Sequence, residues 1–366
     1  MQFNDFVFEE NLRKAATLPS NLYFGEAVFE QERRKIFNNT WQLAGRLEQL
    51  PEVGSFFTTD VAGEPIVIVR GKDEKIRGFF NVCRHRAGPV AQGSGCRSSL
   101  QCAYHGWTYS LDGSLLGTPA FEGVECFNKS DNPLVPIKVE IWEQFIFVNL
   151  NLQSASFADF FEEIPELTKP FNIAKMKFVE RRDYVIDCNW KVYVDNYLEG
   201  YHLPMVHPGL MRELDFANYR TITHRYCSRQ DAPIRQSSGN DATRYYASDG
   251  ETDALYFWVF PNLMININPE TLSTNLIVPL SPEKTLTIFE WFAEDVQSEE
   301  ARKRMLATVE FSDEVQQEDI GICEAVQKGL RSVAYDRGRY SVRFENGLHH
   351  FHLLWREFCL QTPGGA

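Results

Sequence analysis

The 366-residue chain lacks the features that mark membrane-spanning and secreted proteins. It has no run of about 18 apolar residues, so no membrane-spanning helix and no membrane partner are expected. No basic segment followed by an apolar run occurs near the first residue, so the sequence predicts no signal peptide and a cytoplasmic location. The eight cysteines are scattered, which favours metal ligands or core residues over a disulfide framework.

Positive charge is also scarce in this sequence. Lys and Arg number 37 against 50 Asp and Glu, giving a net charge of −13. Nucleic acid is therefore not an expected partner, because phosphate binding requires clustered Lys and Arg. No repeat or low-complexity tract is present, and 43% of the residues are hydrophobic, which suffices for sizeable cores. The length predicts about two domains.

The pattern of apolar residues changes along the chain. Residues 26–45 are predicted to form a helix, because aromatic side chains recur there at four-residue spacing. Residues 50–150 contain short runs rich in Val, Ile and Phe between turn residues, which indicates a small antiparallel β domain. Strands are predicted within 254–293 and a long helix over 296–331. This order favours two domains of mixed α and β type, with a boundary near 150–180.

Two short loops each offer one cysteine and one histidine. Cys83 and His85 form the first pair, and Cys102 and His105 form the second. Thiolates suit iron–sulfur clusters or zinc, and imidazoles suit iron, copper or zinc. In a Rieske 2Fe–2S centre one iron takes two thiolates and the other takes two imidazoles. Structural zinc loops usually pair like ligands, as in Cys-x-x-Cys, so this spacing favours the cluster over the zinc alternative.

A second set of candidate ligands follows near residue 200. Residues 187–202 are predicted to form one helix, which the proline at 204 ends because proline disfavours α conformation in the preceding residue. Asp195, Glu199 and His202 would then share one helix face. His207 would lie on the loop just beyond, where it can converge with His202 on one ion.

A third ligand for that ion is predicted on the long C-terminal helix. Non-haem Fe(II) oxygenases bind iron through two histidines and one carboxylate. The apolar stripe of this helix contains Ile322, Cys323, Val326 and Leu330. One further turn back along the stripe lies Asp319, where a buried carboxylate would be costly unless paired or metal-bound. A helix cap or a salt bridge is the alternative role for Asp319.

Three other histidines are expected to be structural. His349, His350 and His352 lie close together in the sequence. No carboxylate or cysteine pattern joins them, and the ligand sets of both predicted iron sites are complete without them.

The segments CRHRAG and CAYHGWTYSLDG resemble the cluster loops of Rieske non-haem iron oxygenases, and NWKVYVDNYLEGYHLPMVHPGL resembles the iron-site segment of their α subunits. The resemblance covers most of the chain, including QQEDIGICEAVQKGL around the third ligand. It implies a 2Fe–2S cluster bound by Cys83, His85, Cys102 and His105. It also implies a mononuclear Fe(II) bound by His202, His207 and Asp319.

The same resemblance implies the fold, which is of the α+β class. Residues 1–40 are expected to form a helical segment that packs on the catalytic domain. An antiparallel β Rieske domain is expected over 41–150. The catalytic domain, over 151–366, is expected to have the helix-grip (START-like) architecture, in which a curved antiparallel sheet grips helices.

The resemblance further implies an oxygenase component that uses O2. A flavin or iron–sulfur reductase would supply electrons from NAD(P)H, and the oxygenase would be a homotrimer. In such a ring a carboxylate links a cluster histidine of one subunit to an iron histidine of the next. Glu199 is predicted for this role, with His105 and His202 as its partners and Asp195 as the reserve candidate. The second metal motif argues against an electron carrier alone.

The substrate is predicted from one departure from the family pattern. The second acid of the iron motif is usually Asp, and here it is Glu199. This resembles the branch that hydroxylates or N-demethylates quaternary ammonium compounds such as choline, glycine betaine and carnitine. Hydroxylation of an aromatic ring by a dioxygenase is the alternative. Four aromatic residues are expected to line the pocket and attract a cation: Tyr193, Tyr201, Trp258 and Phe260.

Overall fold

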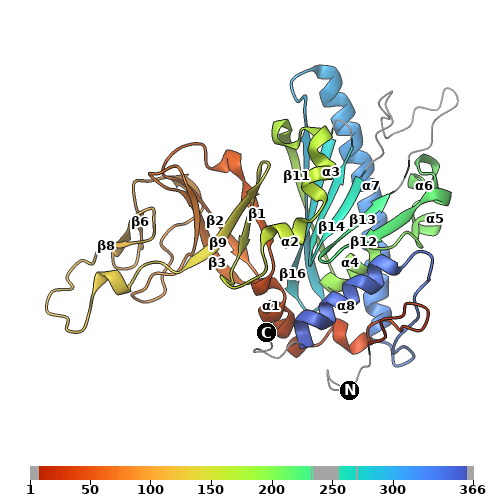
Figure 1. Cartoon of the computed structure of the whole chain (residues 1–366), viewed down its shortest axis with the longest axis horizontal. Coiled ribbons are helices and arrows are strands. Elements are labelled where there is room, and N and C mark those ends of the chain that lie inside the picture. The colour runs from red at the N-terminus through yellow and green to blue at the C-terminus, as the bar shows by residue number, and fades with distance from the viewer. Residues whose placement is uncertain (1–7, 232, 234–254, 269–270, 361–366) are drawn as a thin grey trace. The chain divides into compact units, whose positions relative to one another are not determined.

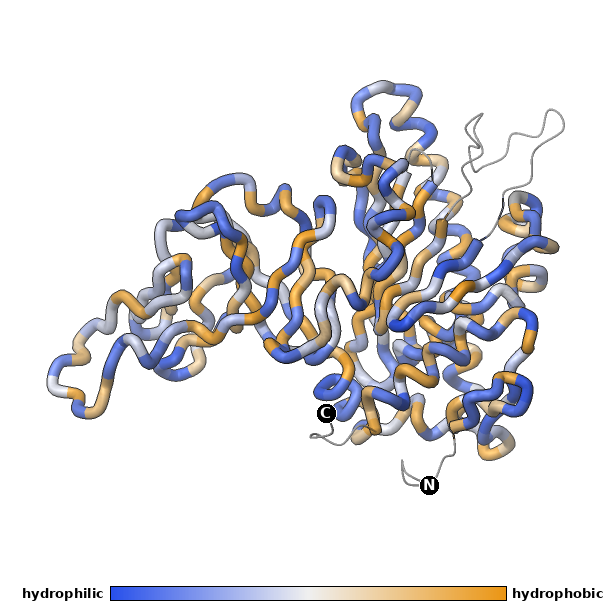
Figure 2. The backbone as a smooth tube through the Cα atoms, viewed as in Figure 1, coloured by the Kyte–Doolittle hydropathy of each residue, from blue (hydrophilic) through white to orange (hydrophobic). Residues whose placement is uncertain are grey.

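A computed structural model describes residues 8–231, 233, 255–268 and 271–360. The chain divides into two compact units, and each is described by itself. One unit is a continuous segment, Phe37–Phe157; the other consists of Met1–Ile36 and Ala158–Ala366. The unit with the cluster motif is thus inserted into the sequence of the unit with the iron motif. Hydrophobic residues occur along the strands of both units (Figures 1 and 2).

The Phe37–Phe157 unit consists mainly of antiparallel strands. Its larger sheet has the order β1-β10-β9-β4-β3-β2-β5, and its smaller sheet has the order β6-β7-β8. The prediction of a small antiparallel β domain is confirmed. The strands are β1 (Gln42–Arg46), β2 (Ser55–Val61), β3 (Glu64–Arg70), β4 (Ile76–Phe80), β5 (Ser94–Cys96), β6 (Leu100–Gln101), β7 (Thr108–Tyr109), β8 (Leu115–Gly117), β9 (Pro136–Trp142) and β10 (Phe145–Asn149).

Strand β3 is buried on both faces, which places the cluster loops against a core. Successive side chains of a strand point to opposite faces of the sheet. Val67 and Val69 pack in one core with the buried Cys83 and Cys102. Ile66 and Ile68, which alternate with them, face a second core on the other side of the sheet. The two predicted thiolate ligands are therefore anchored by packing as well as by their loops.

The catalytic unit contains one curved antiparallel sheet of the order β11-β17-β16-β15-β14-β13-β12. Helices contact this sheet as the helix-grip prediction requires (Figure 1). Its strands are β11 (Lys177–Ile186), β12 (Arg220–Thr223), β13 (Cys227–Asp231), β14 (Leu255–Val259), β15 (Leu263–Ile267), β16 (Thr271–Ser281) and β17 (Lys284–Ala293). The helices are α1 (Glu26–Lys35), α2 (Phe157–Phe161), α3 (Ile164–Thr168), α4 (Trp190–Tyr197), α5 (Leu203–Val206), α6 (Leu210–Glu213), α7 (Glu299–Leu330) and α8 (Asn346–Leu360). Among the described residues, no helix combines the length and apolar character needed to span a membrane.

The helix predicted over residues 26–45 is too long. Helix α1 ends at Lys35, after a last turn of three basic residues that suits the negative end of the helix dipole. An Asn-Asn-Thr segment follows, and such residues compete with helical hydrogen bonding through their side chains. Gln42–Arg46 then forms strand β1 and pairs with β10. Phe37 and Trp41, which continue the aromatic spacing beyond Lys35, belong to the Phe37–Phe157 unit.

The helix predicted over residues 187–202 is also shorter in the structure. Asn189 caps α4, because its side-chain oxygen accepts a hydrogen bond from the Lys191 backbone N–H at 3.0 Å. Helix α4 ends at Tyr197, and α5 begins directly after His202. The proline at 204 lies in the first turn of α5, where no backbone N–H is needed. Glu199 and His202 therefore lie on a loop, and they do not share a helix face with the residues of α4.

A buried ion pair joins α1 to the start of α4. Lys191 Nζ lies 2.6 Å from Glu32 Oε1, and the two side chains are 0% and 1% exposed. Glu32 also accepts hydrogen bonds from the indole N–H groups of Trp190 at 2.8 Å and Trp355 at 2.6 Å. Lys191 donates a further hydrogen bond to Asn189 Oδ1. A buried carboxylate with this many donors is fully compensated, and the removal of one partner should be strongly destabilising.

We expect Lys191→Met to lower the free energy of unfolding by about 3–5 kcal/mol, because Glu32 would be left as a buried charge without a cation. Urea denaturation followed by tryptophan fluorescence measures this change. The matched control is Lys284→Met, which breaks the exposed pair of Lys284 with Asp187 and should change stability by less than about 1 kcal/mol. Equal effects of the two variants would contradict the role assigned to the buried pair.

Candidate metal centres and substrate cavity

The four predicted cluster ligands lie on two adjoining loops of the smaller unit. Cys83 and Cys102 are buried, whereas His105 is exposed at the surface. The rings of His85 and His105 lie 4.6 Å apart between centroids. Partial desolvation and the neighbouring His85 lower the pKa of His105, which favours the neutral imidazole that binds metals. Two buried thiols and two imidazoles form a donor set that fits a Rieske cluster.

Backbone geometry and one tyrosine support these loops. Gly106 has a φ of 73°, which glycine adopts without strain. A Cβ atom at Gly88 would lie 2.9 Å from the sulfur of Cys102, so this close approach also requires glycine. The buried Tyr109 hydroxyl lies 3.3 Å from Cys83 Sγ and accepts a hydrogen bond from the Arg84 backbone N–H at 2.9 Å. Burial and the contact with Cys83 raise the pKa of Tyr109, which keeps it neutral.

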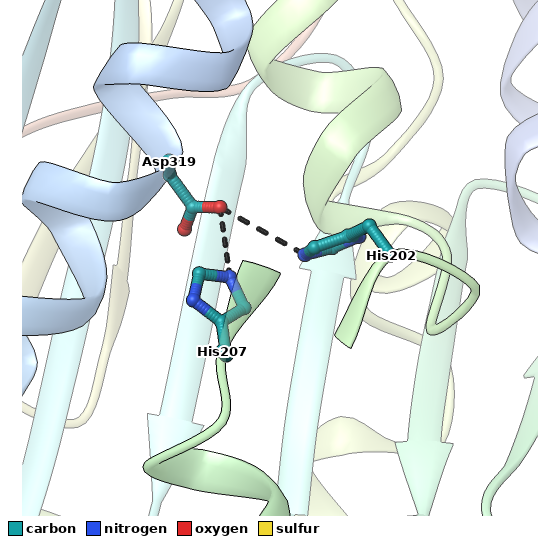
Figure 3. Close-up of side chains that lie close together, drawn as sticks. All are labelled: His202, His207 and Asp319. Carbon is teal, nitrogen blue, oxygen red and sulfur yellow. Dashed lines mark hydrogen bonds and ion pairs between the residues drawn. The ribbon is translucent and has the colours of Figure 1, made fainter. Parts of the chain in front are cut away.

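The three residues predicted to bind the mononuclear iron converge in the catalytic unit. Figure 3 shows His202, His207 and Asp319 directed toward one point. Their potential ligand atoms lie within 4.8 Å of one another. Asp319 Oδ1 is 3.0 Å from His207 Nε2 and 3.8 Å from His202 Nε2. Two imidazoles and one carboxylate from two different helical regions form the donor set of a non-haem Fe(II) site.

Both of these histidines are oriented by a second carboxylate. Glu199 Oε1 lies 2.6 Å from His202 Nδ1, and Glu318 Oε2 lies 2.6 Å from His207 Nδ1. With Nδ1 occupied, each ring presents Nε2 to the metal position. Burial opposes a charge on His207, but Asp319 and Glu318 outweigh burial and raise its pKa.

From the sequence, Glu318 is only a weaker candidate than Asp319 for the carboxylate ligand, and Asn196 has no predicted role. Asn196 donates a hydrogen bond to Asp319 Oδ1 at 2.6 Å. Glu318 lies outside the apolar stripe of α7, and its carboxylate contacts Nδ1 of His207 instead of the metal position. The signal in the sequence is the pair of adjacent acids at 318 and 319, which in the structure contact the two ring nitrogens of His207.

The predicted apolar stripe of the long helix is only partly buried. Cys323 and Leu330 are buried, but Ile322 and Val326 are 37% and 44% exposed. The two exposed residues border a hollow of about 320 Å³ that also contains Asp195, Glu199 and His202. Glu199 and His202 thus border this hollow as well as the substrate cavity described below.

Asp195 points away from the metal position. It accepts a hydrogen bond from the Tyr23 hydroxyl at 2.7 Å and lies 2.9 Å from His352 Nε2. The Tyr340 hydroxyl lies 2.6 Å from the other ring nitrogen of His352. The prediction that Asp195 and Glu199 share a helix face is wrong, because α4 ends between them. His352 has the structural role expected for it, as a support for α4.

A cavity of about 170 Å³ lies beside the three converging residues, between α4, α7 and the sheet. One wall is a row of directly paired residues on successive strands, from β13 to β17. The members of the row are Gln230, Tyr256, Asn266, Ser273 and Trp291. Because paired residues of neighbouring strands lie on the same face, the register of the sheet creates this wall.

The aromatic lining differs from the sequence prediction. Tyr193 lines the cavity and donates a hydrogen bond to Gln316. Tyr201 is 60% exposed and stacks on Phe344, because it lies on the loop beyond α4. Trp258 and Phe260 are fully buried elsewhere, against Phe351 of α8. The aromatic residues that line the cavity are Tyr193, Tyr197, Tyr219, Tyr256, Phe289 and Trp291.

Tyr219 also fixes the loop that carries Glu199 and His202. A Cβ atom at Gly200 would lie 2.6 Å from the Tyr219 ring, so the ring rests directly on the loop backbone. Glu199 accepts hydrogen bonds from the backbone N–H groups of Tyr201 and His202, which closes the turn. The Tyr219 ring, which lines the cavity, and the Glu199 carboxylate therefore both stabilise the loop that contains Gly200 and His202.

Fold and site together define an iron oxygenase with two metal centres, and the comparisons agree with this class. Residues 40–128 match the model of the Rieske [2Fe-2S] domain, and residues 173–361 match that of the ring hydroxylating alpha subunit (catalytic domain). The chain belongs to the Rieske non-haem iron oxygenases, as an α subunit. The alternatives of a zinc-binding structural protein and of an electron carrier alone are thereby excluded.

Several relatives cover nearly the whole chain. Choline monooxygenase of Arabidopsis thaliana is 37% identical over 94% of this chain and 83% of that protein. The carnitine monooxygenase oxygenase subunit of Acinetobacter pittii is 32% identical over 93% of this chain and 94% of that protein. The structure of the quaternary ammonium Rieske monooxygenase CntA with L-carnitine has a TM-score of 0.82, 30% identity, and coverage of 96% and 98% of the two chains. Naphthalene 1,2-dioxygenase shares the fold at 18% identity, with a TM-score of 0.76.

Membership of this family assigns the cofactors and the type of reaction. The protein is an oxidoreductase that uses a 2Fe–2S cluster, a mononuclear iron and O2 to oxidise a small molecule. The donor sets described above fit both metal centres.

Proposed function

We propose that this protein is the oxygenase component of a monooxygenase that hydroxylates, or oxidatively N-demethylates, a small quaternary ammonium compound. The observation that carries the proposal is the chemistry of the cavity beside the proposed iron ligands. Six aromatic side chains line it, and its charged residues, among those described, are the acids Glu199 and Asp319 together with two histidines. No Lys or Arg lines the described part of this cavity.

A quaternary nitrogen has no proton to donate and no lone pair, so it must be recognised by electrostatics and shape. An aromatic ring face attracts such a cation by about 0.5–2 kcal/mol. The identities of the choline and carnitine monooxygenase relatives support the same substrate class.

In the proposed mechanism His202, His207 and Asp319 bind the iron. Iron bound there would supply the chemistry that activates O2, with one oxygen atom entering the substrate. Glu199 and Glu318 orient the two imidazoles through their Nδ1 atoms. The aromatic wall places a methyl or methylene group next to the charged nitrogen close to the metal position.

We also propose that Glu199 links the metal centres of neighbouring copies in a homotrimer. Glu199 would accept hydrogen bonds from His202 and from His105 of the partner subunit. The hollow with exposed Ile322 and Val326 supports this arrangement, because it leaves Glu199 reachable and has an apolar border suited to a second copy. One solved CntA structure is described in terms of inter-subunit electron transfer. Asp195 stays the reserve candidate.

Electron supply by a flavin or iron–sulfur reductase that oxidises NAD(P)H, and a cytoplasmic location, complete the proposal. Aromatic-ring hydroxylation is not favoured, because the likeness to naphthalene 1,2-dioxygenase shows only the fold.

The substrate class can be tested with a pair of compounds that match in shape and differ in charge. We expect hydroxylated product or formaldehyde from at least one of choline, glycine betaine, carnitine and stachydrine. We expect no coupled oxidation of 3,3-dimethylbutan-1-ol, which replaces the choline nitrogen by carbon. Its affinity should be more than about tenfold weaker than that of choline, because it loses the cation–π attraction. Product must be measured, since uncoupled NAD(P)H consumption is not evidence of turnover. Coupled oxidation of benzoate or another arene, with no product from any ammonium compound, would overturn the proposal.

A further inference from the structure

A chain of uncharged hydrogen-bonding groups runs along the cavity from Tyr197, the last residue of α4, to strands β15 and β16. The Tyr197 hydroxyl donates to Asn266 Oδ1 at 2.7 Å. Asn266 Nδ2 in turn donates to Ser273 Oγ at 3.1 Å and lies 3.4 Å from Asn275 Oδ1. Burial raises the pKa of Tyr197 well above its usual value, so this hydroxyl stays a neutral donor. All four side chains line the same cavity.

Asn268 adds a hydrogen-bond acceptor that no described residue satisfies. Its side-chain oxygen is buried and makes no hydrogen bond among the described residues, although Asn268 lines the cavity. A buried acceptor without a donor is unfavourable, so the site gains if a ligand supplies one. A hydroxyl group can donate to this oxygen, whereas an ionised carboxylate can only accept.

The described part of the cavity wall offers an anionic group no side-chain cation. Asp319 and Glu199 are engaged at the proposed metal position, and no Lys or Arg is found among the described lining residues. A ligand carboxylate placed at these wall residues would lose its hydration without gaining an ion pair to any of them, which is unfavourable. An uncharged hydroxyl loses less on leaving water and finds donors and acceptors along the wall.

We propose that Tyr197, Asn266, Ser273 and Asn268 form a subsite for the uncharged polar end of the substrate, so that the enzyme selects an ammonium alcohol over an ammonium carboxylate. This inference rests on the proposed function, because it takes the other end of the substrate to be a quaternary nitrogen held by the aromatic residues. Asn266 is the central member, since it contacts both Tyr197 and Ser273.

Choline and glycine betaine provide the test, because they share the trimethylammonium group and differ in a hydroxyl against a carboxylate. In iron-depleted protein, calorimetric titration should show choline binding at least about tenfold more tightly than glycine betaine. The holoenzyme should show a preference in kcat/KM in the same direction. Tighter binding of glycine betaine or carnitine than of choline would overturn the proposal.

A variant separates the subsite from a general loss of structure. Asn266→Leu should weaken choline binding about tenfold, as expected for the loss of about one hydrogen bond. Tetramethylammonium has no polar end, and its affinity should be the same in wild type and variant. If the variant weakens both ligands equally, Asn266 is structural and the subsite is wrong.

The two proposals fail in different ways. If wild-type protein binds neither tetramethylammonium nor choline, the quaternary ammonium function itself is contradicted. If it binds tetramethylammonium but prefers carboxylates, only the neutral subsite is contradicted. Thr308→Val is a control, because Thr308 lines the cavity from α7 and is not part of the proposed subsite. This variant should leave the ratio of choline affinity to tetramethylammonium affinity unchanged.

Discussion

Replacement of Asp319 by Asn is expected to remove one iron per chain and all measurable product formation, while the visible spectrum of the cluster stays intact. Asp319 supplies the anionic oxygen closest to both Nε2 atoms, at 3.0 and 3.8 Å. Asparagine keeps the shape of the side chain but loses the negative charge that balances a divalent metal. Iron and acid-labile sulfide contents, measured together with product, separate the two metal centres.

Two other acids of α7 serve as controls for this experiment. Asp313→Asn should retain iron and activity, because Asp313 bonds Tyr184 and pairs with Arg182, away from the metal position. Glu318→Gln should reduce activity or iron affinity by about 10–100-fold, as typical for residues that orient a ligand. If Asp319→Asn retains iron and turnover while Glu318→Gln loses both, the carboxylate ligand is Glu318.

The second large effect is expected for Glu199→Gln. This variant should retain both metals and still accept electrons into the cluster, yet product formation should fall by about 100-fold. The carboxylate contacts His202 Nδ1 at 2.6 Å, and a neutral amide accepts hydrogen bonds more weakly than a carboxylate. In the proposed trimer the same group would also accept a hydrogen bond from His105 of the partner subunit.

Single-turnover experiments test this role of Glu199. The cluster is reduced beforehand, substrate and O2 are added, and its reoxidation is followed by absorbance. Asp195→Asn is the matched control, because Asp195 lies in the same hollow but bonds Tyr23 and His352. Reoxidation at the wild-type rate in Glu199→Gln, together with slow reoxidation in Asp195→Asn, would transfer the linking role to the reserve candidate.

The metal-binding residues could be proposed from the sequence because ligand chemistry is local. Cys83 with His85, and Cys102 with His105, lie on short loops whose spacing restricts the kind of centre. Asp319 was predicted by extending an apolar stripe, although Ile322 and Val326 in that stripe are 37% and 44% exposed. The structure brings Asp319 to the two histidines, but the burial argument that pointed to it was only partly right.

The substrate cavity could not be predicted in the same way. Its wall depends on the register of five strands, which the residue pattern of a single strand does not determine. Tyr256 and Trp258 have the same parity on β14 and face the same side of the sheet. Helix α8 covers Trp258, while Tyr256 stays open to the cavity. Only the tertiary packing of a helix about 90 residues further along the chain distinguishes the two.

Helix ends were the other source of error. The spacing of Asp195, Glu199 and His202 suits one helix face, but a glycine at 200 accepts the Tyr219 ring in a contact that no other residue allows. A proline at 204 was interpreted as the end of a helix and instead lies in the first turn of the next one. Both errors concern the ends of helices, which are the least certain part of a helix prediction. The local sequence shows neither the contact of Gly200 with Tyr219 nor the start of a new helix at residue 203.

The inserted arrangement of the two units has a consequence for synthesis of the chain. A ribosome completes residues 37–157 before it has made any of the residues from 158 onward. The cluster-bearing unit is therefore available as a whole while Glu32, already synthesised, still lacks its partners. Lys191 follows 159 residues after Glu32, and Trp355 follows after 323. The hydrogen bonds that Glu32 makes to α4 and to Trp355 are therefore complete only after α8 has been synthesised.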